Sequence, residues 1–287
     1  MKKSVLFFVF VVFAMLLASC GGAAPAGDTS SGDTTSGDTT SGDTTSGDTT
    51  SGDTTSGDTS SGDTASGEPE VCASDEFGCA VIPAGQTVKI GMGAPLTGDY
   101  ASFGVDISQG AAIAVTDAGT VEGFAFELVA QDTQGAPEGG AAVANKLATD
   151  PTVVAIAGHI FSGSTEAAMP IYEKAGMPMM SPSATNPPLT TLGSKVFNRV
   201  AFTDAVQGKF AADYLFNKLG FRKIAVLHDG GAYGQGLADV VQTEFTALGG
   251  EVVGYEAVTP GETDYTATLS ALAAKSPEAV YFGGYVA

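Results

Sequence analysis

The stretch VVAIAGHIFSGST, residues 153–165, decides the fold of this chain. The apolar run at 153–157 has the length of a buried strand, and the segment after it leads to Ser162, a residue type favoured at helix starts. The same order of apolar run, loop and amphipathic stretch recurs from Thr87 onward, which is typical of βαβ units. The sequence therefore predicts an α/β fold with parallel sheets.

The alternating elements form two consecutive sets. Strands of the first set are predicted at 88–94, 124–131, 153–157, 177–180 and 196–200, with helices at 104–117, 137–149, 164–175 and 188–192. Strands of the second set are predicted at 223–228, 251–257 and 279–282, with helices at 205–219, 233–248 and 265–274. The spacing of Asp204 and Gln207 predicts a capping box at the first of these helices.

Two lobes are therefore expected, at 87–203 and 204–287. The second set stops one strand after its second strand–helix unit, which leaves an open sheet edge and an uncovered apolar face. We accordingly expect this second lobe to be incomplete and the natural protein to continue past Ala287.

The first residues predict export. Lys2 and Lys3 precede an uncharged apolar run at 5–17, and small residues then lead to Cys20. This pattern is typical of a removable signal at 1–19, because the run is shorter than the roughly 20 apolar residues of a membrane-spanning helix. The junction before Cys20 resembles the lipobox of bacterial lipoproteins, which implies a lipid on Cys20 and a membrane anchor. Ordinary cleavage that leaves a free thiol is the alternative.

Residues 20–67 are dominated by repeats of Ser-Gly-Asp-Thr-Thr and predict a disordered tether, because so few apolar side chains cannot offset the ordering entropy. A calcium-binding repeat is the alternative, but isolated aspartates lack the ligand density of a calcium loop. The net charge of the whole chain is −20. Acidic residues outnumber basic ones after the tether as well, which argues against nucleic-acid binding.

Cys72 and Cys79 lie in a loop predicted at 68–86, just before the first lobe. Export favours a disulfide between them. A zinc site would need four ligands, and the only histidines, His159 and His228, are far away in the sequence. We therefore predict a disulfide and no metal site.

Seven short motifs follow one another through the two predicted lobes. They are GMGAPLTGDYASFG at 91–104, QG at 109–110, GHIFSGST at 158–165, SPSATNPPLT at 181–190, FTDAVQG at 202–208, LHDGGAYGQGLA at 227–238 and YFGGY at 281–285. In order and spacing they resemble the leucine/isoleucine/valine-binding proteins of bacterial ABC transporters. That resemblance implies a two-lobe type I periplasmic-binding fold. It also implies an extracytoplasmic protein, facing the periplasm or cell exterior, that passes branched-chain amino acids to a transporter permease.

Polar groups for an amino acid are predicted after two strands of the first lobe. Ser162 and Ser164 begin a helix, where free amides and the helix dipole favour a carboxylate, although a plain N-cap role is the alternative for Ser162. Thr185 offers a further hydroxyl from the loop after the next strand. By resemblance, the Ser183 carbonyl and the Thr185 hydroxyl receive the ammonium, and the Ala184 backbone lies alongside. The alternative for this segment is a proline-stiffened connection.

The ligand side chain has four aromatic candidates, all at strand or helix ends: Phe103, Phe161, Tyr233 and Tyr285. Phe103, Tyr233 and Tyr285 match aromatic pocket positions of the family, whereas Phe161 stands where the family has a small residue. Core packing is the alternative for each ring. The resemblance also implies an ammonium-binding carboxylate beyond residue 287.

Enzyme readings find little support. The glycines at 230–236 do not match a dinucleotide fingerprint, Ser162 and Ser164 are not in a nucleophile elbow, and His159 and His228 have no visible catalytic partner. We therefore expect a binding protein without a cofactor. The rival functions keep the scaffold and bind an amide, urea or another amino acid, or report a ligand to a receptor.

Overall fold

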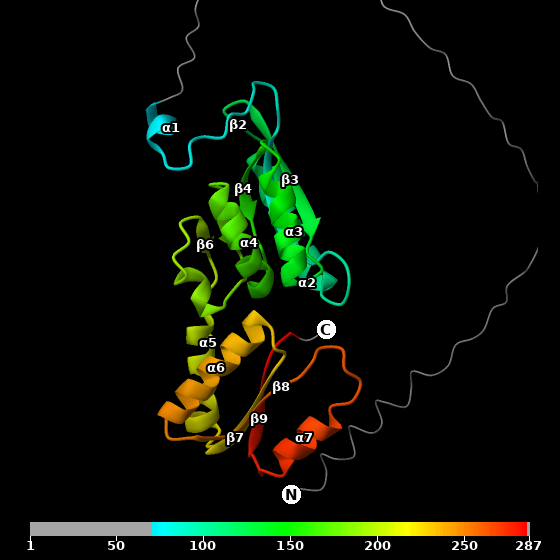
Figure 1. Ribbon diagram of the computed structural model, residues 1–287, viewed down its shortest axis with the longest axis vertical. Coiled ribbons are helices and arrows are strands. Elements are labelled where there is room, and N and C mark those ends of the chain that lie inside the picture. The colour runs from blue at the N-terminus through cyan, green and yellow to red at the C-terminus, as the bar shows by residue number, and fades with distance from the viewer. Residues whose placement is uncertain (1–69, 286–287) are drawn as a thin grey trace, which may run out of the picture. The chain divides into compact units, whose positions relative to one another are not determined.

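The computed structural model describes residues 70–285, which all belong to one compact unit (Figure 1). The predicted signal at 1–19, the predicted lipidation site Cys20 and the predicted tether at 20–67 lie outside the described residues. No helix in the described range is long and apolar enough to cross a bilayer.

The first sheet has six strands in the order β2-β3-β1-β4-β5-β6 (Figure 1). The strands are β1 (Val88–Ala94), β2 (Thr120–Val121), β3 (Phe124–Asp132), β4 (Val153–Ala157), β5 (Met179–Ser181) and β6 (Phe197–Arg199). Every neighbouring pair is parallel except β2 and β3, which form an antiparallel hairpin. The central strands β1 and β4 are largely apolar, as expected of parallel strands that are covered on both faces.

Three α-helices and one 3-10 turn connect these strands. They are α2 (Ala101–Ala118), α3 (Pro137–Ala148), α4 (Ser162–Lys174) and η1 (Pro187–Thr190). α3 and α4 pack closely because Gly140 lies at their contact, where a Cβ atom would be 2.5 Å from the Ser164 carbonyl oxygen. Leu147 of α3 and Tyr172 of α4 are buried in the core that these helices form with the sheet.

The second sheet has three parallel strands in the order β8-β7-β9. Its elements are β7 (Lys223–His228), β8 (Glu251–Ala257), β9 (Ala279–Gly283), α5 (Asp204–Asp213), the π-helical turn η2 (Tyr214–Lys218), α6 (Ala232–Ala247) and α7 (Thr266–Ala273). α5 lies against α6, and Gly208 permits this approach because a Cβ atom there would be 2.6 Å from Val240. Ile224, Val241 and Phe245 form the buried core beside this sheet.

The strand order reverses at β1 in the first sheet and at β7 in the second. β1 lies between β3 and β4, and β7 lies between β8 and β9. In open α/β sheets the loops that leave the carboxyl ends of such strands diverge and leave a crevice for a ligand. The topology therefore directs attention to the loops after β1, β4 and β5, and to those after β7 and β9.

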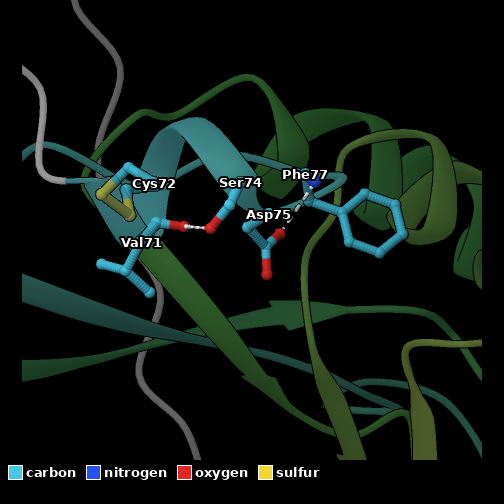
Figure 2. Close-up of a disulfide and its surroundings, with 6 residues drawn as sticks. Val71, Cys72, Ser74, Asp75 and Phe77 are labelled. Atoms are coloured by element: carbon cyan, nitrogen blue, oxygen red, sulfur yellow. Dashed lines mark hydrogen bonds between the residues drawn. A yellow bond between two sulfur atoms is a disulfide. The ribbon is translucent and has the colours of Figure 1, made fainter.

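The segment before β1 contains a short helix, α1 (Glu70–Ser74), that the sequence did not predict. Cys72, within this helix, forms a disulfide with Cys79, which confirms the predicted pairing (Figure 2). The Ser74 hydroxyl donates to the Val71 carbonyl, and the Phe77 amide donates to the Asp75 carboxylate (Figure 2). These local bonds give the loop a defined shape without a large core of its own.

Three details of the predicted elements need correction. The helix expected at 188–192 is a 3-10 turn at Pro187–Thr190, and the helix expected at 205–219 changes to a π-helical turn after Asp213. The hairpin strand β2 was not predicted, because its residues are exposed and it has only two positions.

The predicted capping box is wrong. Thr203 occupies the N-cap position of α5, and no side chain caps this helix. Asp204 is instead the first helical residue, and its side chain is fully buried. The sequence pattern identified the helix start but not the direction of the carboxylate, because tertiary packing decides that direction.

Gly93 of β1 offers a test of the packing beneath the loops. A Cβ atom at this position would be 2.5 Å from the buried ring of His159, so Gly93→Ala should destabilise the protein by about 1–3 kcal/mol through overpacking. Gly110 on the exposed face of α2 has nothing within 4 Å, so Gly110→Ala should stabilise it by up to about 1 kcal/mol. Urea unfolding measures both changes, and equal effects of the two substitutions would contradict this account.

Candidate ligand-binding site

A cavity of about 340 Å³ lies where the loops of the two sheets meet. Its lining comes from α2, from the loops after β4 and β5, and from α5, α6 and the segment after β9. The lining residues are Phe103, Ile107, Ile160, Phe161, Ser183, Thr185, Gln207, Tyr233, Gly284 and Tyr285. A volume of this size is sufficient for a small organic ligand.

Aromatic rings form the apolar wall of the cavity. The rings of Phe161 and Tyr285 are stacked, with centroids 4.1 Å apart, and Tyr233 lies 4.8 Å from Tyr285. Phe103 contacts Phe161 edge to face at 6.0 Å, and Tyr100, which the sequence analysis did not single out, contacts the same ring at 5.5 Å. The predicted aromatic candidates are thus brought together in the cavity lining, where Phe161 and Tyr285 also pack on the core around Met92 and Ile160.

Ser183 and Thr185 supply polar groups to the cavity wall. Both follow β5, at the carboxyl end of the first sheet, and both are half-buried. The Ser183 hydroxyl donates to the Ile160 carbonyl at 2.7 Å, which fixes the loop after β5 to the loop after β4. The Thr185 carbonyl accepts the amide of Asp204 at 3.0 Å.

Ser162, Ser164 and Ala184 lie behind the wall rather than on it. Ser162 is the first residue of α4, and its hydroxyl accepts the Asn186 amide at 3.3 Å. The Ser164 hydroxyl donates to the Phe161 carbonyl at 3.0 Å. All three residues are buried. The Ser164 hydroxyl hydrogen is bonded within the protein, whereas the Ser162 hydroxyl acts as an acceptor and keeps its own hydrogen. The N-cap position of α4 belongs to Phe161, so Ser162 is not a cap.

The start of α4 nevertheless faces an oxygen atom. Burial raises the pKa of the Tyr285 hydroxyl, and the Ser162 amide acts on this pKa in the opposite direction. Helix N-termini attract electron-rich oxygens in this way.

Arg199 of β6 holds the loop that carries Thr185. Its guanidinium donates to the carbonyls of Ala184, Asn186 and Pro187, at 3.1, 2.8 and 3.3 Å. It also donates to the Thr190 hydroxyl at 2.6 Å. The Ala184 carbonyl is therefore committed to the protein.

Two further contacts fix the parts of the site that come from the second sheet. The Asn186 side-chain amide donates to the Ala232 carbonyl, at the start of α6, at 2.7 Å. The Asp229 carboxylate accepts the amides of Gly231 and Tyr285 at 2.9 and 3.2 Å. Asp229 thus sets the backbone position from which the Tyr285 ring enters the cavity.

Asp204 is a buried carboxylate beside the cavity. Its side chain is 0 % exposed, and neither carboxylate oxygen accepts a well-formed hydrogen bond from the described residues. Burial raises the pKa of Asp204 to about 6, although the Thr185 side chain and the Arg199 charge act to lower it. A carboxylate in such surroundings is costly to ionise without a compensating partner.

Both histidines form hydrogen bonds with other groups of the protein. His159 is fully buried, its Nε2 atom lies 2.9 Å from the Tyr172 hydroxyl, and burial lowers its pKa to about 4. Its carbonyl accepts the hydroxyls of Ser181 and Thr165. The His228 Nδ1 atom accepts the Gly230 amide at 3.1 Å. Among the described residues, no group of three or more His, Cys, Asp or Glu side chains is arranged to hold a metal ion.

Several site residues were missed by the sequence analysis. Ile107 lies one helical turn after Phe103, and Ile160 directly precedes Phe161, so their positions beside predicted residues were available signals. Gln207 was assigned to a capping box, but it lines the cavity. No local pattern indicated the role of Arg199, because its partners are spread over the loop before it.

Comparison with known proteins assigns this chain to a family. The periplasmic binding protein family model matches residues 87–287, most of the chain. The chain belongs to the periplasmic binding protein family. This finding confirms the resemblance and the α/β fold that the motifs predicted.

Curated members of this family resemble the chain over about 200 residues. An "Amino acid binding protein" of Pseudomonas aeruginosa is 40% identical over 200 residues, which are 69% of this chain and 54% of the relative. A leucine-, isoleucine-, valine-, threonine- and alanine-binding protein of the same organism is 37% identical, over 70% of this chain and 55% of the relative. The Leu/Ile/Val-binding protein of Escherichia coli is 34% identical, with the same coverage. The chain thus spans about half the length of the curated relatives it matches.

Solved structures of periplasmic binding proteins agree with this comparison. A leucine-binding protein from Thermotoga maritima matches with a TM-score of 0.64 and 34% identity, over 68% of this chain and 55% of that chain. A branched-chain amino acid transporter substrate-binding protein from Streptococcus pneumoniae, in complex with isoleucine, matches with a TM-score of 0.61 and 32% identity. It covers 68% of this chain and 56% of that chain.

The buried Asp204 gives this periplasmic binding protein a testable pH dependence. Its pKa is about 6 in the folded state and about 3.8 in an exposed carboxyl, so the folded state holds more protons between these values. Its contribution to stability is therefore present below about pH 4 and is lost as the pH rises through about 6. Asp204→Asn should remove this loss and raise the free energy of unfolding at pH 7 by roughly 2–3 kcal/mol.

Urea unfolding of both proteins from pH 4 to 8 measures this difference. Asp213→Asn, on the exposed side of the same helix, is the matched control and should follow the unsubstituted protein. If Asp204→Asn also follows the unsubstituted protein at every pH, Asp204 is not a buried titrating group.

Proposed function

We propose that this protein captures branched-chain amino acids outside the cytoplasm and delivers them to the permease of an ABC transporter. The observation that carries the proposal is the composition of the cavity, which combines an aromatic wall with polar groups from the loop after β5 and from α5. A free amino acid with an aliphatic side chain has the same division into a charged head and an apolar tail. The names of the relatives support this choice of ligand.

In this proposal the ligand carboxylate binds at the first turn of α4. The Tyr285 hydroxyl lies near the Ser162 amide, which supports the view that this turn accepts an oxygen. Ser164 contributes through its backbone amide, because its hydroxyl hydrogen is already bonded within the protein, whereas Ser162 contributes its amide and its hydroxyl hydrogen. Tyr285 would then turn aside or rest against the ligand when the site is occupied.

The ammonium is proposed to bind at Thr185 and the Ser183 carbonyl. Thr185 lines the cavity, and its side chain is close enough to Asp204 to lower the pKa of that residue. Ala184 lies alongside, but its carbonyl is bonded to Arg199 and is not part of the proposed ammonium site. Phe103, Phe161, Tyr233 and Tyr285 would enclose the aliphatic side chain.

The remaining parts of the chain fit capture at a membrane surface. We propose that the signal at 1–19 directs export, that Cys20 carries the lipid anchor, and that residues 20–67 act as a tether. The loop at 68–86 then leads into two lobes at 87–203 and 204–287, which close around the ligand near residues 202–204. Binding and release are the proposed activity, with no chemical step.

An aromatic carboxylate is the second candidate ligand, because four rings surround the cavity. A solute-binding protein from Rhodopseudomonas palustris, solved with 3,4-dihydroxybenzoic acid, matches with a TM-score of 0.60 and 27% identity. Such a ligand has a carboxylate and no ammonium. It would leave the buried Asp204 without a cationic partner, and the amino acid is therefore the preferred candidate.

Titration calorimetry with the purified protein distinguishes these ligands. Leucine, isoleucine and valine should bind, whereas acetamide, urea and 3,4-dihydroxybenzoate should give no heat or bind at least tenfold more weakly, since each lacks part of the charged head. Binding of the benzoate with no binding of the three amino acids would overturn the proposal in favour of the second candidate.

Thr185→Val tests the polar end of the site. The substitution keeps the shape and the backbone bond to Asp204 but removes the hydroxyl, so leucine affinity should fall by about 10–100-fold. Thr191→Val, at an exposed position after η1, is the control and should leave the affinity unchanged. Equal affinities of the two variants would exclude the Thr185 hydroxyl from ligand binding.

A further inference from the structure

Asp204 is a buried acidic residue whose carboxylate has no partner among the described residues. It is the first residue of α5, it is 0 % exposed, and both of its carboxylate oxygens are unsatisfied within the described part of the chain. A buried carboxylate is normally paired or protonated, because an isolated buried charge is expensive. The family resemblance placed the ammonium-binding carboxylate beyond residue 287, but this carboxylate lies within the described chain.

Arg199, the nearby basic residue, does not pair with Asp204. Its guanidinium makes four hydrogen bonds, to three backbone carbonyls and to the Thr190 hydroxyl. None of these bonds reaches Asp204, and the charge of Arg199 only partly offsets the effect of burial. The negative charge of an ionised Asp204 is therefore left for another cation.

Asp204 is connected to the cavity through Thr185. The Asp204 amide donates to the Thr185 carbonyl at 3.0 Å, which keeps the two residues side by side. The Thr185 side chain faces Asp204 closely enough to lower its pKa, and the same residue lines the cavity. The Asp204 charge also raises the pKa of Tyr233 and Tyr285, two other residues of the wall. The carboxylate thus lies directly behind this part of the wall.

We propose that Asp204 is the counter-charge for the ligand ammonium, acting through the Thr185 hydroxyl, and that ligand binding releases the proton that Asp204 holds in the empty site. Thr185 would donate its hydroxyl hydrogen to Asp204 and accept a hydrogen from the ammonium with a lone pair of the same oxygen. Asp204 is therefore a positioning residue, because it acts on the ammonium through the Thr185 hydroxyl and does not contact the ligand. The inference rests on the proposed capture of an amino acid.

The surrounding groups leave Asp204 as the titrating member of this cluster. The groups that act on it or sense its charge are Arg199 of β6, Thr185 after β5, Tyr233 of α6, Tyr281 of β9 and Tyr285 after β9. Burial raises the pKa of the tyrosines, that of Tyr281 to about 12, so they stay neutral near pH 7. Arg199 stays charged over the same range.

Proton release follows from the balance of charge. In the empty site near pH 6, about half of the molecules carry a proton on Asp204. The ammonium of a bound amino acid favours the ionised carboxylate, so this proton leaves to solvent as the ligand enters. Leucine affinity should therefore rise with pH by at most about tenfold per unit below pH 6 and become constant above about pH 7.

Calorimetry of leucine binding in two buffers of different ionisation enthalpy measures the proton directly. The unsubstituted protein should release about half a proton at pH 6 and none at pH 8. Asp204→Asn should release none at either pH, and its leucine affinity at pH 8 should fall at least tenfold. Asp213→Asn, the exposed control on α5, should behave like the unsubstituted protein. Urea unfolding of each variant verifies that it is folded.

A leucine analogue without the amino group separates a charge effect from a structural one. Binding of 4-methylpentanoate should be no weaker in Asp204→Asn than in the unsubstituted protein, because this ligand has no ammonium to lose and its carboxylate no longer faces a negative charge. If Asp204 only supports the fold, both ligands should weaken together and no proton should be released, which would overturn the inference.

The outcomes also separate this inference from the proposed function. If the unsubstituted protein binds none of the three branched-chain amino acids, the proposed function fails and the inference fails with it. If it binds leucine without releasing a proton at pH 6, the proposed function stands and the role of Asp204 is excluded.

Discussion

The polar end of the site depends on the hydrogen bonds of one guanidinium. Arg199 holds the loop from Ala184 to Thr190 by bonding three of its carbonyls and one hydroxyl. Carbonyls that turn away from a sheet ladder need donors, and the planar fork of arginine supplies several at once. The loop in turn presents Thr185 to the cavity and Asn186 to the start of α6. Through Arg199, the edge strand β6 of the first sheet thereby fixes Thr185 in the cavity wall and Asn186 against the second sheet's helix α6.

The two charged residues at this end of the site, Arg199 and Asp204, differ in their hydrogen bonding. The Arg199 guanidinium donates most of its hydrogen bonds to backbone carbonyls, whereas the Asp204 carboxylate has no hydrogen-bond partner among the described residues. The charge of Arg199 only partly offsets the effect of burial on Asp204, so an ionised Asp204 favours a cation beside Thr185. The stacked rings of Phe161 and Tyr285 form an apolar part of the cavity lining. The proposed site thus has a charged group behind one part of its lining and aromatic rings in another.

Much of this architecture could be predicted from the sequence, because strands and helices follow local periodicity. The strands at 88–94, 153–157 and 223–228 have the predicted boundaries, and the disulfide was predicted from two nearby cysteines and an expected export signal. The rings of Phe103, Phe161, Tyr233 and Tyr285 were named from their places at element ends, and the structure positions all four around the cavity.

The failures of prediction that affect the site concern the directions of polar side chains. Asp204 was expected to turn toward its own helix, yet it is buried beside a loop that is distant in the sequence. Ser164 was expected to offer its hydroxyl, but this group donates to the Phe161 carbonyl, while the Ser162 hydroxyl accepts the Asn186 amide. Whether a polar side chain faces a ligand or the protein depends on tertiary contacts, and the spacing of residues along one chain does not contain that information.

The segment that carries the disulfide joins the first lobe far from the cavity along the strand direction. The Phe77 side chain packs on Gly176, just before β5, and Lys195 forms an ion pair with Glu76 at 2.6 Å. These contacts lie at the amino ends of the strands, whereas the cavity lies at their carboxyl ends. A load applied through Glu70 would therefore act on the base of the sheet and leave the loops that line the cavity undisturbed.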